Sequence, residues 1–240
     1  GKIMKKIITT IAFIALTTVS AKAVELPSLG NFSLTLGAAT NQGVFAASAT
    51  ETGQDHSGVD NQIKKKHGVF TDGYSSQFVE LGIGKWISIG YEHTPDSIST
   101  PTNTTRHGGA NEANVSVDFN DVNTTYVRLN LPFIDGLYAK AGTVETDLDI
   151  KEVMGSGSTY KNVSTEGTMM GVGYSRNLGE SNFALRVEGS YMELDNVTTS
   201  NGVAKGTTTT LNERGHNRVD GSNMEGLQGK VALTFTIGRD

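Results

Sequence analysis

The chain has 240 residues and a formal net charge of −5, which argues against nucleic acid as a partner because the phosphate backbone selects basic surfaces. It contains no cysteine, so no disulfide framework holds it together. Hydrophobic residues make up only 36% of the chain, and beyond the N-terminal segment no stretch is long and apolar enough for a membrane helix, which excludes a helical membrane protein.

The N-terminal segment has the three parts of a secretory signal peptide. A lysine-rich start precedes residues 7–19, which are apolar apart from threonine, and small residues surround an expected cleavage site after Ala23. Met4 is the expected start of translation. Because the apolar run is shorter than the roughly 20 residues that a spanning helix needs, we expect residues 1–23 to be removed on export and residues 24–240 to form one mature domain.

Apolar residues then alternate with glycine, polar and charged residues, a period that is typical of half-buried β-strands. The expected strands cover residues 31–38, 78–83, 86–92, 115–133, 137–150, 170–175, 183–191 and 227–237. Short turns follow the second, fourth and sixth of them, and long polar loops are expected at residues 41–76, 95–109, 151–165 and 197–223.

Two of these strands depart from a simple membrane crossing. The fourth is longer than the about 9 to 11 residues that a barrel strand needs, so its first part is expected to project as a ribbon. In the fifth, the apolar parity moves from Leu137 and Ala141 to Val144 and Leu148, which predicts a β-bulge.

The alternation of long and short connections places all long loops at one end, and all short turns with both termini at the other. Bacterial outer-membrane barrels are built in this way. The sequence therefore predicts an all-β protein, an eight-stranded antiparallel up-and-down transmembrane β-barrel with four long external loops and periplasmic termini.

Charged residues lie opposite the apolar stripes. Four bases and three acids are expected to pair inside the barrel, because isolated buried charge is too costly: Glu80, Glu92, Arg128, Lys140, Arg186, Glu188 and Lys230. On a soluble barrel the same residues would face water, and fractionation would separate the two readings. Aromatic residues expected at the membrane interfaces are Tyr91, Phe133, Phe183, Tyr191 and Phe235.

Residues 171–191, GVGYSRNLGESNFALRVEGSY, resemble the penultimate hairpin of the OmpA/OmpX/opacity-type outer-membrane barrels. The resemblance extends over the mature chain as strand spacing, and it implies a small barrel in the bacterial outer membrane. Members of that family carry a terminal aromatic residue recognised during assembly. Here the chain continues for five residues beyond Phe235, so Phe235 is the candidate for that role.

No motif predicts catalysis, a metal or a cofactor. His93 lies between Glu92 and Thr94, but adjacent strand residues point to opposite faces and cannot form one triad. Carboxylates and a histidine at residues 55–72 lack the spacing of a metal site. The basic run at residues 64–67 either contacts lipopolysaccharide phosphates or is simply solvated.

We therefore expect a non-enzymatic, monomeric barrel with a structural or surface-interaction role, adhesive or receptor-like. Its expected partners are outer-membrane lipid, lipopolysaccharide and a surface or phage ligand at the loops. The alternative function is a narrow pore or minor porin, although eight strands enclose a space that side chains just fill. A lipid-modifying enzyme is a third reading, which altered lipid A on overexpression would reveal.

Overall fold

The computed structural model describes residues 29–54, 57–106, 112–153, 159–206 and 215–238. The expected signal peptide, residues 1–23, lies outside them. None of the described residues forms a helix of the length and apolar character needed to cross a membrane.

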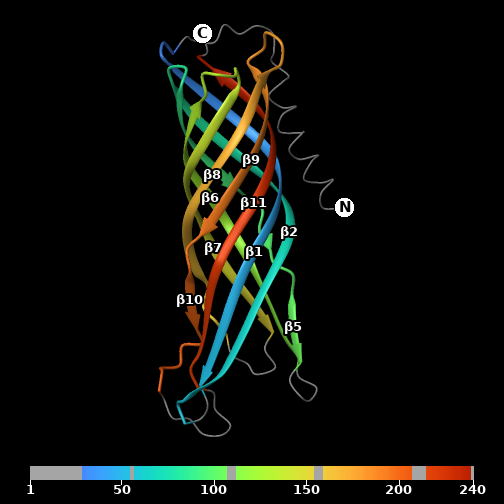
Figure 1. The fold of residues 1–240 in the computed structure, drawn as a ribbon, viewed down its shortest axis with the longest axis vertical. Helices are drawn as coiled ribbons and strands as arrows, with labels where there is room; N and C mark the ends of the chain where they lie inside the picture. Colours follow the sequence, from blue (N-terminus) through green and yellow to red (C-terminus); the bar gives the residue numbers. More distant parts are fainter. Residues whose placement is uncertain (1–28, 55–56, 107–111, 154–158, 207–214, 239–240) are drawn as a thin grey trace.

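Eight long strands form a closed antiparallel ring in the order β1-β2-β3-β6-β7-β8-β9-β11, and pairing of β1 with β11 closes it. The predicted eight-stranded up-and-down barrel is thus confirmed (Figure 1). Its strands are β1 Phe32–Gln54, β2 Asp60–Ile83, β3 Ile87–Thr94, β6 Glu112–Asn130, β7 Leu137–Val153, β8 Val163–Asn177, β9 Phe183–Leu194 and β11 Asn217–Ile237. Three short strands lie outside the ring order: β4 Ile98–Ser99 and β5 Asn103–Arg106 pair with β6, and β10 Val197–Ser200 pairs with β11.

Tight turns join β2 to β3, β6 to β7 and β8 to β9 at one end of the barrel, which is also where the described chain ends (Figure 1). Each turn contains a glycine with positive φ: Gly84 at 60°, Gly136 at 85° and Gly179 at 66°. Residues other than glycine rarely adopt that backbone conformation, so these glycines make the turns possible. The predicted short turns are confirmed.

At the other end the predicted loops are much too long. Residues 41–76, expected to be a loop, are almost entirely strand, because β1 has 23 residues and β2 has 24. The loop predicted at residues 151–165 is shortened from both sides by β7 and β8, and the loop predicted at 197–223 is shortened by β10 at its start and by β11 at its end. The polar and glycine-rich composition of these segments predicted loops. They form strands nevertheless, because backbone hydrogen bonds between neighbouring strands hold them together without an apolar outer stripe.

The predicted bulge in the fifth strand is also wrong. The register shift lies in β6, between Asn120 and Asn123, where Asp121 adopts a φ of 48°. In β7 the even-numbered residues stay inward, and Val144 and Leu148 are buried. The apolar residues change face because the interior itself changes from polar to apolar along the barrel axis.

This change divides the barrel into a turn half and what we call the extension. The turn half is apolar outside and polar inside, whereas the extension has mostly polar outer positions, with Val44, Ile63 and Val69 as exposed exceptions, and an apolar interior. The extension comprises residues 40–54, 60–76, 112–123, 143–153, 163–168, 193–194 and 217–226, with β4, β5 and β10.

Candidate functional site

The lumen of the turn half contains a charged cluster centred on Glu80 of β2. Arg186 of β9 donates two hydrogen bonds to its carboxylate, at 2.7 and 2.8 Å, and Arg128 of β6 lies 3.2 Å from Oε2. The Tyr126 hydroxyl donates a further bond at 2.9 Å. Glu80 is only 2% exposed, so protein groups have replaced its water contacts.

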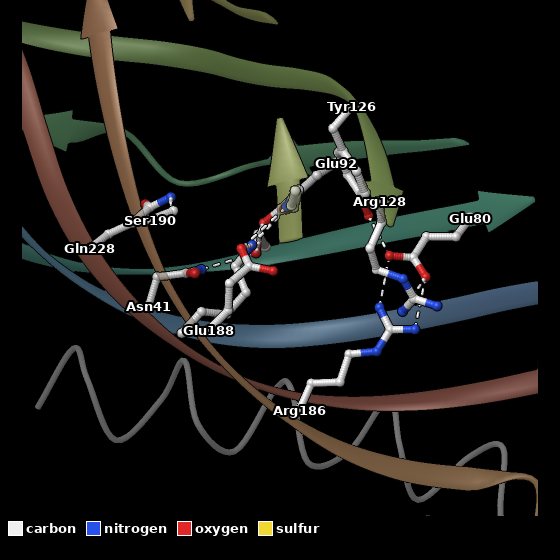
Figure 2. Close-up of polar contacts among 12 residues, drawn as sticks. Asn41, Glu80, Glu92, Tyr126, Arg128, Arg186, Glu188, Ser190 and Gln228 are labelled. Atoms are coloured by element: carbon white, nitrogen blue, oxygen red, sulfur yellow. Dashed lines mark hydrogen bonds and ion pairs between the residues drawn. The ribbon is translucent and has the colours of Figure 1, made fainter. Parts of the chain in front are cut away.

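A second cluster follows along the barrel axis, with one residue each from β3, β7, β9 and β11. Lys140 Nζ lies 3.0 Å from Glu92 and 3.3 Å from Glu188. Lys230 Nζ lies 2.6 Å from Glu92 and 3.3 Å from Glu188. Two lysines therefore alternate with two glutamates in a square of buried, neutralised charge. The structure thus brings all seven predicted lumen charges into two adjoining clusters. Figure 2 labels Glu80, Arg128 and Arg186 of the first cluster and Glu92 and Glu188 of the second.

Two tyrosines that were not among the predicted lumen residues, Tyr126 and Tyr138, join the clusters. Tyr126 bonds to Glu80, while Lys140 Nζ lies 3.8 Å from the centroid of its ring. Tyr138 donates to Glu188 at 3.0 Å, while the guanidinium of Arg128 lies 5.2 Å from its ring centroid. Both share strand parity with the lumen charges, a signal that could have identified them.

Uncharged polar groups form the next layer toward the extension. Ser76 donates to Glu92 at 2.7 Å, and Asn41 donates to Ser76 at 3.0 Å. Gln228 donates to Ser190 at 2.8 Å and accepts a hydrogen bond from the Tyr74 hydroxyl. The uncharged side chains of this layer come from four strands, β1, β2, β9 and β11, as the left of Figure 2 shows for Asn41, Ser190 and Gln228.

An apolar core closes the lumen inside the extension. Its buried members are Phe45, Phe70, Tyr74, Ile98, Val122, Val144, Met169 and Met192. Phe45 and Phe70 stack with ring centroids 5.4 Å apart. A cavity of about 30 Å³ remains among these side chains, too small for an organic ligand.

The outer face of the turn half carries a continuous apolar belt. Its side chains are about half exposed in the isolated chain, although they are large and aliphatic, and they come from every ring strand except β7: Leu36, Val79, Leu81, Ile83, Ile87, Ile89, Val127, Leu129, Met170, Val172, Leu185, Val187 and Val231. On β7 the same positions hold Leu137 and two alanines. Such a surface is stable only when lipid or detergent covers it.

The predicted interfacial aromatics lie at the two edges of this belt. At the turn end, Phe133 is 87% exposed, and the rings of Phe183 and Phe235 pack with centroids 5.0 Å apart. Toward the extension, the Tyr91 hydroxyl donates to Asn123 at 2.7 Å and the Tyr191 hydroxyl donates to Glu225 at 2.8 Å. Their anchoring role remains a prediction.

Candidate catalytic and metal-binding residues are not assembled into a site. His93 Nδ1 lies 2.8 Å from Asn123 Oδ1 and contacts no nucleophile. Of the carboxylates and histidine at residues 55–72, Asp55 and His56 lie outside the described residues, Asp60 accepts a bond from Gln54, and Asp72 accepts one from the backbone of Ser99. In the described part of the chain no three His, Cys, Asp or Glu side chains are grouped to hold a metal ion.

In the extension, the pKa values of Asp118 and Glu152 are shifted in opposite directions. Burial raises the pKa of Asp118, but the hydrogen bonds from Lys151 and Ser99 and the charge of Lys151 together outweigh it, so the pKa lies below its usual value. The pKa of Glu152 is raised, mainly by partial burial and also by the nearby charge of Glu51.

No protein-family model and no curated protein matches the chain. Among solved structures it is similar to the outer membrane protein OprG from Pseudomonas aeruginosa, with a TM-score of 0.51 and 11% identity over 85% of this chain and 97% of that one. The chain is also similar to Ail, the attachment invasion locus protein of Yersinia pestis, in complex with the heparin analogue sucrose octasulfate. The TM-score is 0.35 and the identity is 8% over 83% of this chain and 99% of that one. For the outer membrane protease OmpT from Escherichia coli, the TM-score is 0.41 and the identity is 12% over 91% of this chain and 100% of that one.

A closed eight-stranded barrel with an apolar belt and a charged interior is an outer-membrane β-barrel in its architecture. The similarity to OprG shows the same fold. The chain therefore has the fold of the small outer-membrane β-barrels, as the alternation along its strands predicted.

Proposed function

We propose that this barrel is a non-enzymatic surface-interaction protein, which anchors in the outer membrane through its turn half and presents the extension to partners outside the cell. The observation that carries the proposal is the reversal of polarity along the strands. A barrel segment with polar outer positions and an apolar core is built for water, not for lipid.

Strand length supports this division. A tilted strand crosses the membrane in about 9 to 11 residues, whereas β1, β2 and β11 have 23, 24 and 21. About half of each therefore extends beyond the bilayer. The apolar core gives this projecting part a defined shape, which suits recognition of a ligand.

The test is a trimmed variant in which a two-residue Asn-Gly turn replaces residues 48–67, so that Ala47 still pairs with Gly68 and the buried pair of Phe45 and Phe70 is retained. Cells displaying either form are compared for adhesion to immobilised lipopolysaccharide, glycosaminoglycan and matrix proteins, and for phage adsorption. Loss of one of these interactions at equal surface amount is expected. A trimmed barrel that retained every interaction and envelope phenotype would contradict the proposal.

The pore alternative conflicts with three successive closures of the lumen. Ion pairs, a polar layer and an apolar core all cross it, and each would have to open before an ion could pass. We expect no steady conductance from the purified barrel in planar bilayers, and stable single channels would favour the pore.

The monomeric state and the lack of enzymatic activity belong to the same proposal. Light scattering in detergent is expected to give one chain per micelle. Overexpression is expected to leave the lipid A mass spectrum unchanged, and a new lipid A species would point to an enzyme instead.

A further inference from the structure

Strand β2 has a strand neighbour on only one side over most of its length in the extension. It pairs with β1 from Asp60 to Ile83 but with β3 only from Gln77 onward, because β3 ends at Thr94. In the described part of the chain, β4 and β5 follow β3 but pair with β6 alone. Residues 60–76 therefore have no paired strand on the side away from β1 among the described residues, although β4 lies near the Asp72 to Ser75 part of β2.

The hydrogen-bonding direction identifies which backbone groups face this open side. The Gly84 amide bonds to β1, at Asn31 O, whereas the Ser75 amide bonds away from β1, to the Asp96 carboxylate at 2.9 Å. Backbone groups of an antiparallel strand alternate between its two sides, so the odd-numbered residues of β2 face the open side.

Five consecutive odd positions then remain available, namely Ile63, Lys65, His67, Val69 and Thr71. All five are exposed, with Val69 at 71% and Ile63 at 64%, and among the described residues none has a hydrogen-bonding partner on that side. Residues 63–71, which we call the β2 edge, span about 30 Å. Such an edge is a template for an additional strand.

The charge of the edge restricts the kind of strand that fits. Lys65, Lys66 and His67 follow Lys64, whose ammonium lies 3.7 Å from the carboxylate of Glu51 on β1. The nearby acids of β2 also have partners, since Asp60 lies 3.6 Å from Lys205 and Asp72 binds backbone amides. A second copy would bring the same lysines against themselves and be repelled. A strand with carboxylates would be attracted.

We propose that the β2 edge docks an extended acidic peptide segment, which adds to the sheet as a further antiparallel or parallel strand. Backbone hydrogen bonds supply affinity, and carboxylates opposite Lys65 supply selectivity. The inference rests on the proposed surface-interaction role and specifies one partner for it. Lysines also protect sheet edges from aggregation, so the experiment must separate docking from protection.

The probe is a fluorescent nine-residue peptide that alternates glutamate with valine and threonine, and its anisotropy is measured with the mature barrel in lipid nanodiscs. One control peptide carries proline at its centre, and another carries lysine in place of glutamate. The protein variant Val69→Pro removes an edge amide where proline is tolerated, and Val69→Thr is the matched control that keeps it. Gel mobility before and after boiling verifies that each variant folds.

The acidic peptide is expected to bind, with affinity reduced about tenfold by Val69→Pro and little by Val69→Thr. Lys65→Gln is expected to weaken binding and its salt dependence, and both control peptides are expected to bind poorly. The inference would be overturned if the acidic peptide bound equally well to the Val69→Pro variant, or if the proline-containing acidic peptide bound as well as the original one. Either result would mean that the edge attracts acidic peptides by charge alone. If cross-linking gave dimers of the unmodified barrel but not of the Val69→Pro variant, the occupant of the edge would be a second copy of the chain instead.

The two proposals fail separately. If the acidic peptide does not bind but trimming residues 48–67 abolishes adhesion, strand addition is wrong and the surface role stands. If trimming changes nothing, the surface role itself is wrong.

Discussion

Replacing Glu80 by glutamine is expected to lower the free energy of unfolding by about 3 to 5 kcal/mol, the cost of removing one member of a buried ion pair. Among the described carboxylates, Glu80 is the one that forms ion pairs with both Arg128 and Arg186. Its removal leaves two guanidinium groups in a site where the side chains of these arginines are 12% and 7% exposed. A glutamine oxygen still accepts a hydrogen bond, but its NH2 group faces a cation.

Urea unfolding in detergent or vesicles measures the effect, with the emission of Trp86, the sole tryptophan, as the signal. Glu166→Gln is the matched control, because this exposed carboxylate lies outside the lumen, and a change within about 0.5 kcal/mol is expected. In the double variant Glu80→Gln/Arg186→Gln, the loss is expected to be smaller than the sum of the single losses. A loss below about 1 kcal/mol for Glu80→Gln would show that water reaches the cluster, and would refute the sealed lumen.

Three further perturbations test other parts of the barrel. Met169→Ala, in the apolar core of the extension, is expected to cost about 2 to 5 kcal/mol on unfolding, whereas a negligible loss would mean that the extension is filled by water. Asp121→Gly is expected to be neutral or stabilising and Asp121→Val destabilising by about 1 to 2 kcal/mol, because φ is positive there, and equal stability of the two would contradict the assigned bulge. Because the pKa of Glu152 is raised in the folded state, its ionisation opposes folding above that pKa and is absent below the unfolded value. Glu152→Gln is therefore expected to stabilise at pH 7.5 and to have no effect near pH 3 in urea unfolding, and the opposite order would contradict the shift.

The sequence predicted the turn half well, because lipid outside and charge inside produce a clean period of two. Glu80, Arg128 and Lys140 could be assigned to the lumen by parity alone, since each lies opposite aliphatic residues and close to a short turn. Their pairing could not be predicted, because it depends on the stagger between strands that are far apart in sequence, such as β2 and β9.

The extension could not be predicted in the same way. Outside the membrane the outer positions need only be soluble, so Gly73 and Ser75 on β2 resemble loop residues. The interior needs only a few large residues, and Phe45 and Phe70 are isolated among small ones. In β7 the change of interior polarity produced the same parity switch as a bulge, and only the register of β6 and β7 distinguishes the two explanations.

The charged lumen has a physical reason beyond filling space. Buried ion pairs are poor stabilisers, and apolar residues of similar size would often give a more stable interior. In this barrel, however, the outer face of the turn half is already apolar, so an apolar lumen would leave both faces of each strand equivalent. A slip of one residue in strand register exchanges the two faces. With Glu80, Arg128 and Lys140 inside, that slip would bring charge into lipid, at a cost of about 2 to 4 kcal/mol for each basic residue at the bilayer centre. The ion pairs therefore favour one strand register, although they lower the stability of the barrel. Because the same strands continue into the extension, that register also fixes which residues face its interior.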